Sequence, residues 1–284
     1  MINRSTLLES IFFISAAVSA LLTAAVFVFL FIFACPLLMR GDWIQLITSA
    51  WLPDQGLFGI YPMMIATLLL AILSLAIAFP MSLGTSMVIV ALAPLRLRYL
   101  LLCFVRFMTA IPTVVYSFAA MFILVPFMRN LLASGSGMSL LTAAPVLALL
   151  IAPTLIIFFV NSFQQVPAAS DLAPESLGAS PTQKLIYVIL PQAWPGILMG
   201  LLLGFARATG DTMISLMLAG NSAAIPESLT DSARTLTAHI ALVLAFDFDS
   251  MEFKSVFLCG LILYLITAVI TLLLRAGFRL YGKG

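Results

Sequence analysis

The sequence predicts an all-α, polytopic membrane protein with six transmembrane helices. The chain has 284 residues, of which 63% are hydrophobic and only 8% are charged, whereas a soluble globular protein carries about 25% charged residues. A helix that crosses a bilayer needs about 20 mostly apolar residues, and the apolar segments of this chain supply six such helices. Most of the chain is therefore expected to lie in lipid, and we expect no nucleic-acid partner.

The six helices are expected near residues 10–39, 59–93, 98–128, 139–164, 192–220 and 253–276. The first follows Arg4 and exceeds the apolar region of about 7–15 residues in a cleavable signal peptide, so we interpret it as a retained helix. This order divides the chain into three parts. They are an N-terminal helix with its outer loop (1–58), a core of five helices (59–276) and a tail (277–284).

Prolines interrupt three of the expected helices. The second helix is longer than one span needs and carries Pro80 and Gly84, which predict a tilt, a kink or a break near its middle. The third carries Pro112, and the fourth carries Pro145 and Pro153. Neighbouring helices can satisfy the backbone groups that a proline frees, so these residues do not argue against transmembrane helices.

The distribution of lysine and arginine predicts the orientation, because cytoplasmic loops carry an excess of both. With the N-terminus inside, the inner side holds seven of these residues: Arg4, Arg96, Arg98, Lys184, Arg275, Arg279 and Lys283. The outer side holds four: Arg40, Arg129, Arg234 and Lys254. Both termini and the loop 165–191 are therefore expected in the cytoplasm.

The loop 165–191 has the composition of a compact unit rather than of a linker. Asp171 can cap a short helix that Gly178 ends in a left-handed conformation. Pro181 then opens a second short helix, with Leu185, Ile186 and Ile189 on one side. Two short helices joined by a glycine turn form a compact unit, here called the knob, that can transmit a movement to the helices on either side of it. The alternative is an ordinary loop that returns the chain to the membrane.

Arg207 and Asp211 place two charges inside an apolar segment. They are four residues apart, so on one helix they share a face and can pair. An arginine at the bilayer centre costs about 2.5–3.5 kcal/mol on insertion scales and above 10 kcal/mol in simulations, so it must face protein or water. Its planar set of donors is suited to an oxyanion. The alternative is a structural ion pair that locks two helices together.

Several classes of site are absent from the sequence. No G-x-x-x-x-G-K-[ST] run is present, so the chain has no phosphate-binding loop for ATP. Its cysteines, Cys35, Cys103 and Cys259, are far apart and fit neither a metal site nor a disulfide framework. No nucleophile–base pair accompanies the single histidine, His239, which we expect to be solvated or packed against a helix. We therefore expect no cofactor and no enzymatic activity of the chain's own.

The loop resembles the coupling loop of bacterial ABC-transporter permeases. That pattern is Glu-Ala-Ala, three residues, Gly, nine residues, then Ile-x-Leu-Pro. Here Gly178 and Ala179 are followed at the expected distance by Leu190 and Pro191. The N-terminal part of the pattern differs, because the Glu-Ala-Ala positions are occupied by Leu172, Ala173 and Pro174. The carboxylates lie instead at Asp171 and Glu175.

Two further segments resemble the permease subunits of phosphate-specific transporters, and a third stretch, 220–222 with 235–242, resembles the C-type subunit in particular. The segment 110–116, with Pro112 and Tyr116, is similar to their Ile-Pro-Ser-Val-Val-Tyr-Gly, and we expect it to form a kink or gate. The segment 206–213, with Arg207, Asp211 and Thr212, is similar to their Ala-Arg-Ala-Leu-Gly-Glu-Thr-Met. A departure lies six residues before Pro112, where Arg106 replaces a glutamate. Arg106 is either part of the substrate path or a side chain that reaches the membrane surface.

The resemblance implies membership of the binding-protein-dependent inner-membrane component family, with its type I importer permease fold. It implies a subunit of a phosphate importer in the bacterial inner membrane. The implied partners are a second homologous permease, a cytoplasmic ATPase dimer and an external phosphate-binding protein, for which the acidic outer segment 221–252 is a candidate docking surface. The implied substrate path includes Arg207, Asp211, Thr212 and Arg106. The alternatives are a permease for another oxyanion, such as molybdate or sulfate, and a secondary transporter.

Overall fold

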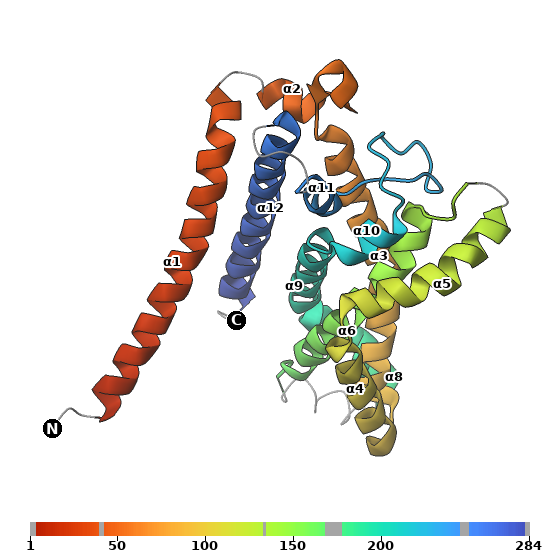
Figure 1. Ribbon diagram of the computed structural model, residues 1–284. Coiled ribbons are helices and arrows are strands. Elements are labelled where there is room, and N and C mark those ends of the chain that lie inside the picture. Colours follow the sequence, from red (N-terminus) through yellow and green to blue (C-terminus); the bar gives the residue numbers. More distant parts are fainter. Residues whose placement is uncertain (1–3, 40–42, 133–134, 168–177, 245–249, 282–284) are drawn as a thin grey trace.

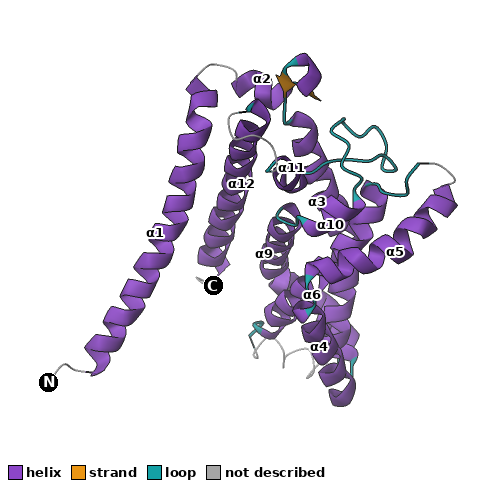
Figure 2. Cartoon of the chain, viewed as in Figure 1, coloured by secondary structure: helices purple, strands orange, loops and turns teal. Residues whose placement is uncertain are grey.

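The computed structural model confirms the all-helical membrane fold (Figure 2). It describes residues 4–39, 43–132, 135–167, 178–244 and 250–281. Within these residues, six helices are long and apolar enough to cross a membrane, namely Leu8–Cys35, Tyr61–Leu92, Thr113–Leu132, Leu140–Gln164, Pro181–Thr209 and Met251–Gly277. The number of spans therefore agrees with the prediction, although several boundaries differ.

The elements follow one another in a simple order (Figure 1). The N-terminal part holds α1 (Arg4–Met39), α2 (Trp43–Thr48), and strands β1 (Trp51–Leu52) and β2 (Leu57–Phe58), which pair antiparallel around the short helix η1 (Pro53–Gln55). The first half of the core holds α3 (Tyr61–Met87), the π-helix η2 (Val88–Leu92), α4 (Leu95–Ala110), α5 (Thr113–Leu132) and α6 (Leu140–Gln164). The second half holds α8 (Pro181–Lys184), the π-helix η3 (Leu185–Ile189), α9 (Leu190–Thr209), α10 (Met213–Leu218), α11 (Leu236–Val243) and α12 (Met251–Tyr281).

Three sequence predictions about the helices were wrong in detail. The helix expected at 98–128 is two helices, α4 and α5, because the chain is extended at Ile111 and Pro112 cannot donate a backbone hydrogen bond. Of the tilt, kink or break expected near Pro80, the break does not occur: α3 runs through Pro80 and widens into the π-helix at residues 88–92. The helix expected at 192–220 begins at Pro181 and ends at Thr209.

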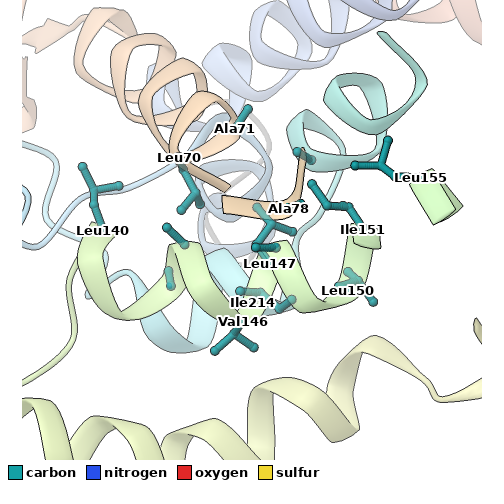
Figure 3. Packing of buried hydrophobic residues seen from close by; sticks show 14 of the residues in the cluster. Leu70, Ala71, Ala78, Leu140, Val146, Leu147, Leu150, Ile151, Leu155 and Ile214 are labelled. Atoms are coloured by element: carbon teal, nitrogen blue, oxygen red, sulfur yellow. The ribbon is translucent and has the colours of Figure 1, made fainter. Parts of the chain in front are cut away.

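Helix α6 lies at the centre of the fold. Helices α3, α4, α5, α9 and α10 all pack against it, and Figure 3 shows its apolar side chains between α3 and the segment that carries Ile214. Leu147, Ile151 and Leu155 are fully buried in this core. The expected prolines Pro145 and Pro153 lie inside α6 without ending it, which agrees with the tolerance for proline in a surrounded membrane helix.

Helix α9 approaches α6 closely through a row of glycines. Gly196, Gly200 and Gly204 lie four residues apart, and a methyl group on each would lie 2.5–2.8 Å from a side-chain atom of Ser162, Phe159 or Leu155, respectively. Small residues at this spacing let membrane helices approach each other. The spacing therefore brings α9 into close contact with α6.

Helix α1 stands apart from the rest of the bundle in Figure 1 and packs against α12. Aromatic side chains form this contact, with ring centroids 5.1 Å apart for Phe27 and Tyr264 and 4.8 Å apart for Phe33 and Phe257. Most of the α1 surface is apolar and exposed, as expected for a helix in contact with lipid.

Candidate functional site

Arg207 lies in the last turn of α9, half-buried against α6. Its Nη1 donates a hydrogen bond to the Thr154 hydroxyl, which follows Pro153 in α6. A guanidinium has five N–H donors. Within the described part of the chain, Arg207 uses one of them, in this bond to a neutral oxygen. The remaining donors are therefore not engaged by described protein groups.

Asp211 lies beyond the end of α9, in the break formed by residues 210–212. Its Oδ2 accepts the Ile214 amide at 2.8 Å, and its backbone oxygen accepts the Thr237 hydroxyl of α11 at 2.8 Å. The Ser215 hydroxyl donates to the same backbone oxygen at 3.1 Å. The carboxylate therefore caps α10, and among the described residues no direct bond to Arg207 forms. The expected pairing of Arg207 with Asp211 depended on one continuous helix, and the structure does not have a continuous helix here.

Thr212 and Tyr116 complete the surroundings of Arg207. Thr212 is half-buried and its backbone oxygen accepts the Leu216 amide at 2.9 Å. Tyr116 on α5 and Asp211 are both close enough to the Arg207 guanidinium to interact with it electrostatically. The Tyr116 hydroxyl donates to the Met108 backbone oxygen at 3.1 Å and so joins α5 to the last turn of α4. The structure thus brings Arg207, Asp211 and Tyr116 into one neighbourhood.

Pro112 and Arg106 belong to the α4–α5 segment. Pro112 lies at the break between the two helices, where its backbone oxygen accepts the Val115 amide at 3.0 Å. Arg106 is exposed on α4, a helix whose buried residue is Val105. No contact among the described residues joins the Arg106 side chain to Arg207.

The expected coupling segment, 165–191, is described at residues 165–167 and from Gly178 onward, and Asp171 and Glu175 lie outside the described residues. Gly178 has a φ of 75°, the left-handed conformation that the sequence predicted. Ser180 and Gln183 form a reciprocal capping box, and Pro181 occupies the first helical turn. Ala179 is half-buried.

The structure differs from the predicted knob at the C-terminal end of the helix that begins at Pro181. It continues through Leu190 and Pro191 into α9 as one span, Pro181–Thr209. Leu185 and Ile189 are buried, but Ile186 is 46% exposed, because it lies on another side of the helix. Helix α8 packs against η2 at the end of α3. This segment is therefore continuous with α9, which carries Arg207.

A polar cleft of about 430 Å³ lies between the loop before α6 and the segment 222–232. Glu227 and Asp231 line it together with several serines. Its walls are tied together, since the Leu141 amide donates to the Leu229 oxygen at 2.8 Å and the Ser232 hydroxyl donates to the Met138 oxygen at 3.0 Å. Residues 222–232, part of the acidic segment that the sequence predicts on the outer side, therefore form one wall of this cleft.

His239 is fully buried in α11, as one of the two expected environments requires. Its Nε2 lies 3.2 Å from the Ser255 hydroxyl, and its ring meets Trp51 edge-on with ring centroids 4.4 Å apart. Its Nδ1 has no hydrogen-bond partner among the residues that the structure describes. Burial, together with the nearby Arg234 charge, lowers the pKa of His239 to about 3. The imidazole is therefore neutral at physiological pH and packs as a structural residue.

Sequence reasoning missed Thr154 and Thr237. The signal for Thr154 was present, because it is the one polar residue in the apolar run 146–160. Thr237 gave no such signal, since it lies in a mixed segment and acts on a backbone oxygen 26 residues away.

Comparisons with known proteins agree with this architecture. The family described as "Binding-protein-dependent transport system inner membrane component" matches residues 83–280. A probable ABC transporter permease protein, YqgH of Bacillus subtilis, is 31% identical over 82% of this chain and 76% of its own length. The phosphate transport system permease protein PstC of Pasteurella multocida is 30% identical over 87% of this chain and 85% of its own.

A solved structure supports the fold at lower identity. The MetNI methionine ABC transporter in an inward-facing conformation has a chain that aligns with a TM-score of 0.58 and 20% identity, covering 80% of this chain and 96% of that one. This identity supports the fold alone. Six apolar spans, the packing around α6 and the family match over most of the core lead to one assignment: the chain belongs to the family of inner-membrane permease components of binding-protein-dependent ABC importers.

Proposed function

We propose that this chain is the permease subunit of an ATP-driven importer for inorganic phosphate and forms half of its translocation path. The proposal rests on the half-buried Arg207, which donates a hydrogen bond to a neutral hydroxyl rather than to a carboxylate. A charge within the membrane is expensive and by default marks a functional path. An arginine whose donors are not engaged by the protein is suited to hold an oxyanion during passage.

The relatives support phosphate as the anion. Several are named phosphate transport system permease proteins, at identities of 25–30% over most of the chain. Arg207 takes part in the path with Asp211, Thr212 and Arg106. The charge of Asp211, which lies near Arg207 without a direct bond to it, limits how tightly Arg207 retains the anion.

The mechanism is alternating access in a complex with a second, homologous permease. A cytoplasmic ATPase dimer binds the segment 165–191, and its closure on ATP moves this segment and α9 relative to α6. Pro112 and Tyr116 allow α4 and α5 to follow the movement. In this arrangement both termini lie in the cytoplasm of a bacterium, and the region 59–276 forms the moving core.

The outer cleft is the contact region for the external binding protein. Its lining carboxylates, Glu227 and Asp231, repel a free anion but attract a basic surface of a protein partner. The binding protein therefore delivers phosphate over the cleft, and the anion passes to Arg207 deeper in the bundle.

The first test is ATP hydrolysis by the reconstituted complex with its ATPase and its binding protein. We expect phosphate to stimulate hydrolysis, with molybdate and sulfate inactive. Stimulation by another oxyanion would change the substrate but keep the permease. An ATPase that neither binds nor responds would contradict the proposal and favour a secondary transporter.

The second test concerns Arg207. We expect Arg207→Gln to abolish phosphate uptake in proteoliposomes while the complex still assembles. Arg129→Gln is the matched control, because Arg129 is an exposed arginine in the last turn of α5. Loss of assembly in Arg207→Gln would instead assign Arg207 a structural role.

A further inference from the structure

Thr154 is the side chain in direct contact with Arg207, and its position is built into the packing of two helices. A methyl group on Gly204 would lie 2.8 Å from Leu155 Cδ2 and 3.1 Å from Leu75 Cδ1. Gly204 therefore brings α9 against α6 at the turn that holds Thr154. Arg207 follows Gly204 by three residues, which places it on nearly the same side of α9.

The α6 turn before Thr154 is itself held by α3. The Ser82 hydroxyl donates to the Ala152 backbone oxygen at 3.3 Å, and both Ser82 and Ile151 are fully buried. The threonine thus stands on a fixed backbone, whereas Arg207 is long and has several rotatable bonds. Where a fixed hydroxyl accepts from a flexible guanidinium, the hydroxyl determines the guanidinium position.

The Thr154 hydroxyl also differs from a carboxylate in its charge and in its ability to donate a hydrogen bond. Thr154 does not itself neutralise the arginine charge, and its hydroxyl carries a proton that it can donate while its oxygen accepts. Within the described residues, the Thr154 proton is not donated to any protein acceptor. An oxyanion bound to Arg207 can therefore accept hydrogen bonds from both residues.

We propose that Thr154 is a positioning residue for Arg207 and a second donor to the anion in transit. The inference rests on the proposed function of Arg207. It extends the candidate path to α6, the central helix, so that the anion lies between α6 and α9. Movement of α9 relative to α6 then separates the two donors and releases the anion.

The test uses the full complex in proteoliposomes at saturating phosphate and binding protein. Thr154→Val keeps the shape and removes both hydrogen-bonding functions, and Thr154→Ser keeps them. Loss of a hydrogen bond to a charged group corresponds to about a tenfold to hundredfold effect. We therefore expect Thr154→Val to slow phosphate uptake at least tenfold, and Thr154→Ser to remain within about threefold of the unmodified complex. Thr271→Val is the control, because the exposed Thr271 donates to the Thr267 oxygen of its own helix.

A double-mutant cycle separates positioning from simple packing. If Thr154 acts through Arg207, adding Thr154→Val to Arg207→Lys causes little further loss of uptake. Equal losses in Thr154→Val and Thr154→Ser, or additive losses with Arg207→Lys, would overturn the inference. If Thr154→Val transports normally while Arg207→Gln is inactive, the inference fails and the proposed function stands. If Arg207→Gln also transports normally, the proposed function itself fails.

Discussion

The glycine contact between α9 and α6 permits a quantitative test of the packing that positions Arg207. In Gly200→Ala, the new methyl group would lie 2.7 Å from Phe159 Cε1 and 3.0 Å from Phe158 Cδ1. Phe159 cannot withdraw easily, because it is fully buried and meets Phe79 edge-on with ring centroids 6.1 Å apart. The helices must therefore separate or the ring must leave its preferred rotamer.

The expected cost follows from two opposing effects. Overpacking a tight core by one methyl group costs about 1–3 kcal/mol, while replacing glycine by alanine inside a helix contributes about 1 kcal/mol of stability. Gly84→Ala isolates the second effect, because no atom lies within 4 Å of a methyl group on Gly84 of α3. The difference between the two variants in free energy of unfolding is therefore expected to be about 1–3 kcal/mol.

The assay is unfolding of the purified chain in detergent micelles, with Gly200→Ala, Gly84→Ala and the unmodified protein measured in parallel. Gly200→Ala should unfold at lower denaturant than Gly84→Ala. Since Gly200 lies two turns before Arg207 on α9, we also expect reduced phosphate uptake at a temperature where the variant remains folded. Identical unfolding midpoints for the two alanine variants would refute the close approach of α9 to α6.

Three further measurements test His239, the coupling segment and the cleft lined by Glu227 and Asp231. The pKa of His239 is lowered to about 3, below the ordinary value near 6.5, so its contribution to stability is complete above pH 6.5 and is lost as the pH falls. Between pH 7.5 and 5.5 we expect the free energy of unfolding to decrease by about 1.4 kcal/mol through this residue, and His239→Asn should remove this decrease; an unchanged pH dependence would contradict the assignment. Gly178→Val places a β-branched residue at a φ of 75°, where it is strained, and should uncouple ATP hydrolysis from uptake. Gly178→Asn, which tolerates this conformation, should stay coupled, and coupling in both variants would argue against a role for the turn. For the cleft, Glu227→Lys should weaken stimulation of the ATPase by the binding protein, whereas Asp54→Lys, on an exposed residue outside the cleft, should not; equal effects would exclude the cleft as the docking region.

The transmembrane spans could be predicted from the sequence because lipid imposes one strong requirement on them. A segment such as 140–164 has to be apolar along its length to remain in the membrane, and α6 was expected at nearly its observed bounds. The conformation at Gly178 was also predictable, because it depends on the local backbone preference of glycine.

The ends and breaks of the helices were less predictable, because hydrophobicity reports the surroundings of a segment and not its hydrogen bonds. The apolar residues Met213–Leu218 continue the hydrophobic pattern of α9, so the two helices appear as one in the sequence. The break is stabilised by the Asp211 cap and by Thr237, which reaches the Asp211 oxygen from α11. Thr154 is similarly 53 residues away from Arg207 in the chain. Such contacts are formed by the tertiary fold.

The break at residues 210–212 changes what the two charges can do. On a continuous helix, Arg207 and Asp211 would neutralise each other. In the structure, Arg207 lies in the last turn of α9 and Asp211 lies before the first turn of α10. A cation at a helix C-terminus and an anion at a helix N-terminus are each stabilised by about 0.3–1 kcal/mol. Each charge thus has a favourable helix end of its own, and Arg207 does not need Asp211 as a direct partner. The proposed transport role therefore follows more readily from two short helix ends than from the single helix that the sequence suggested.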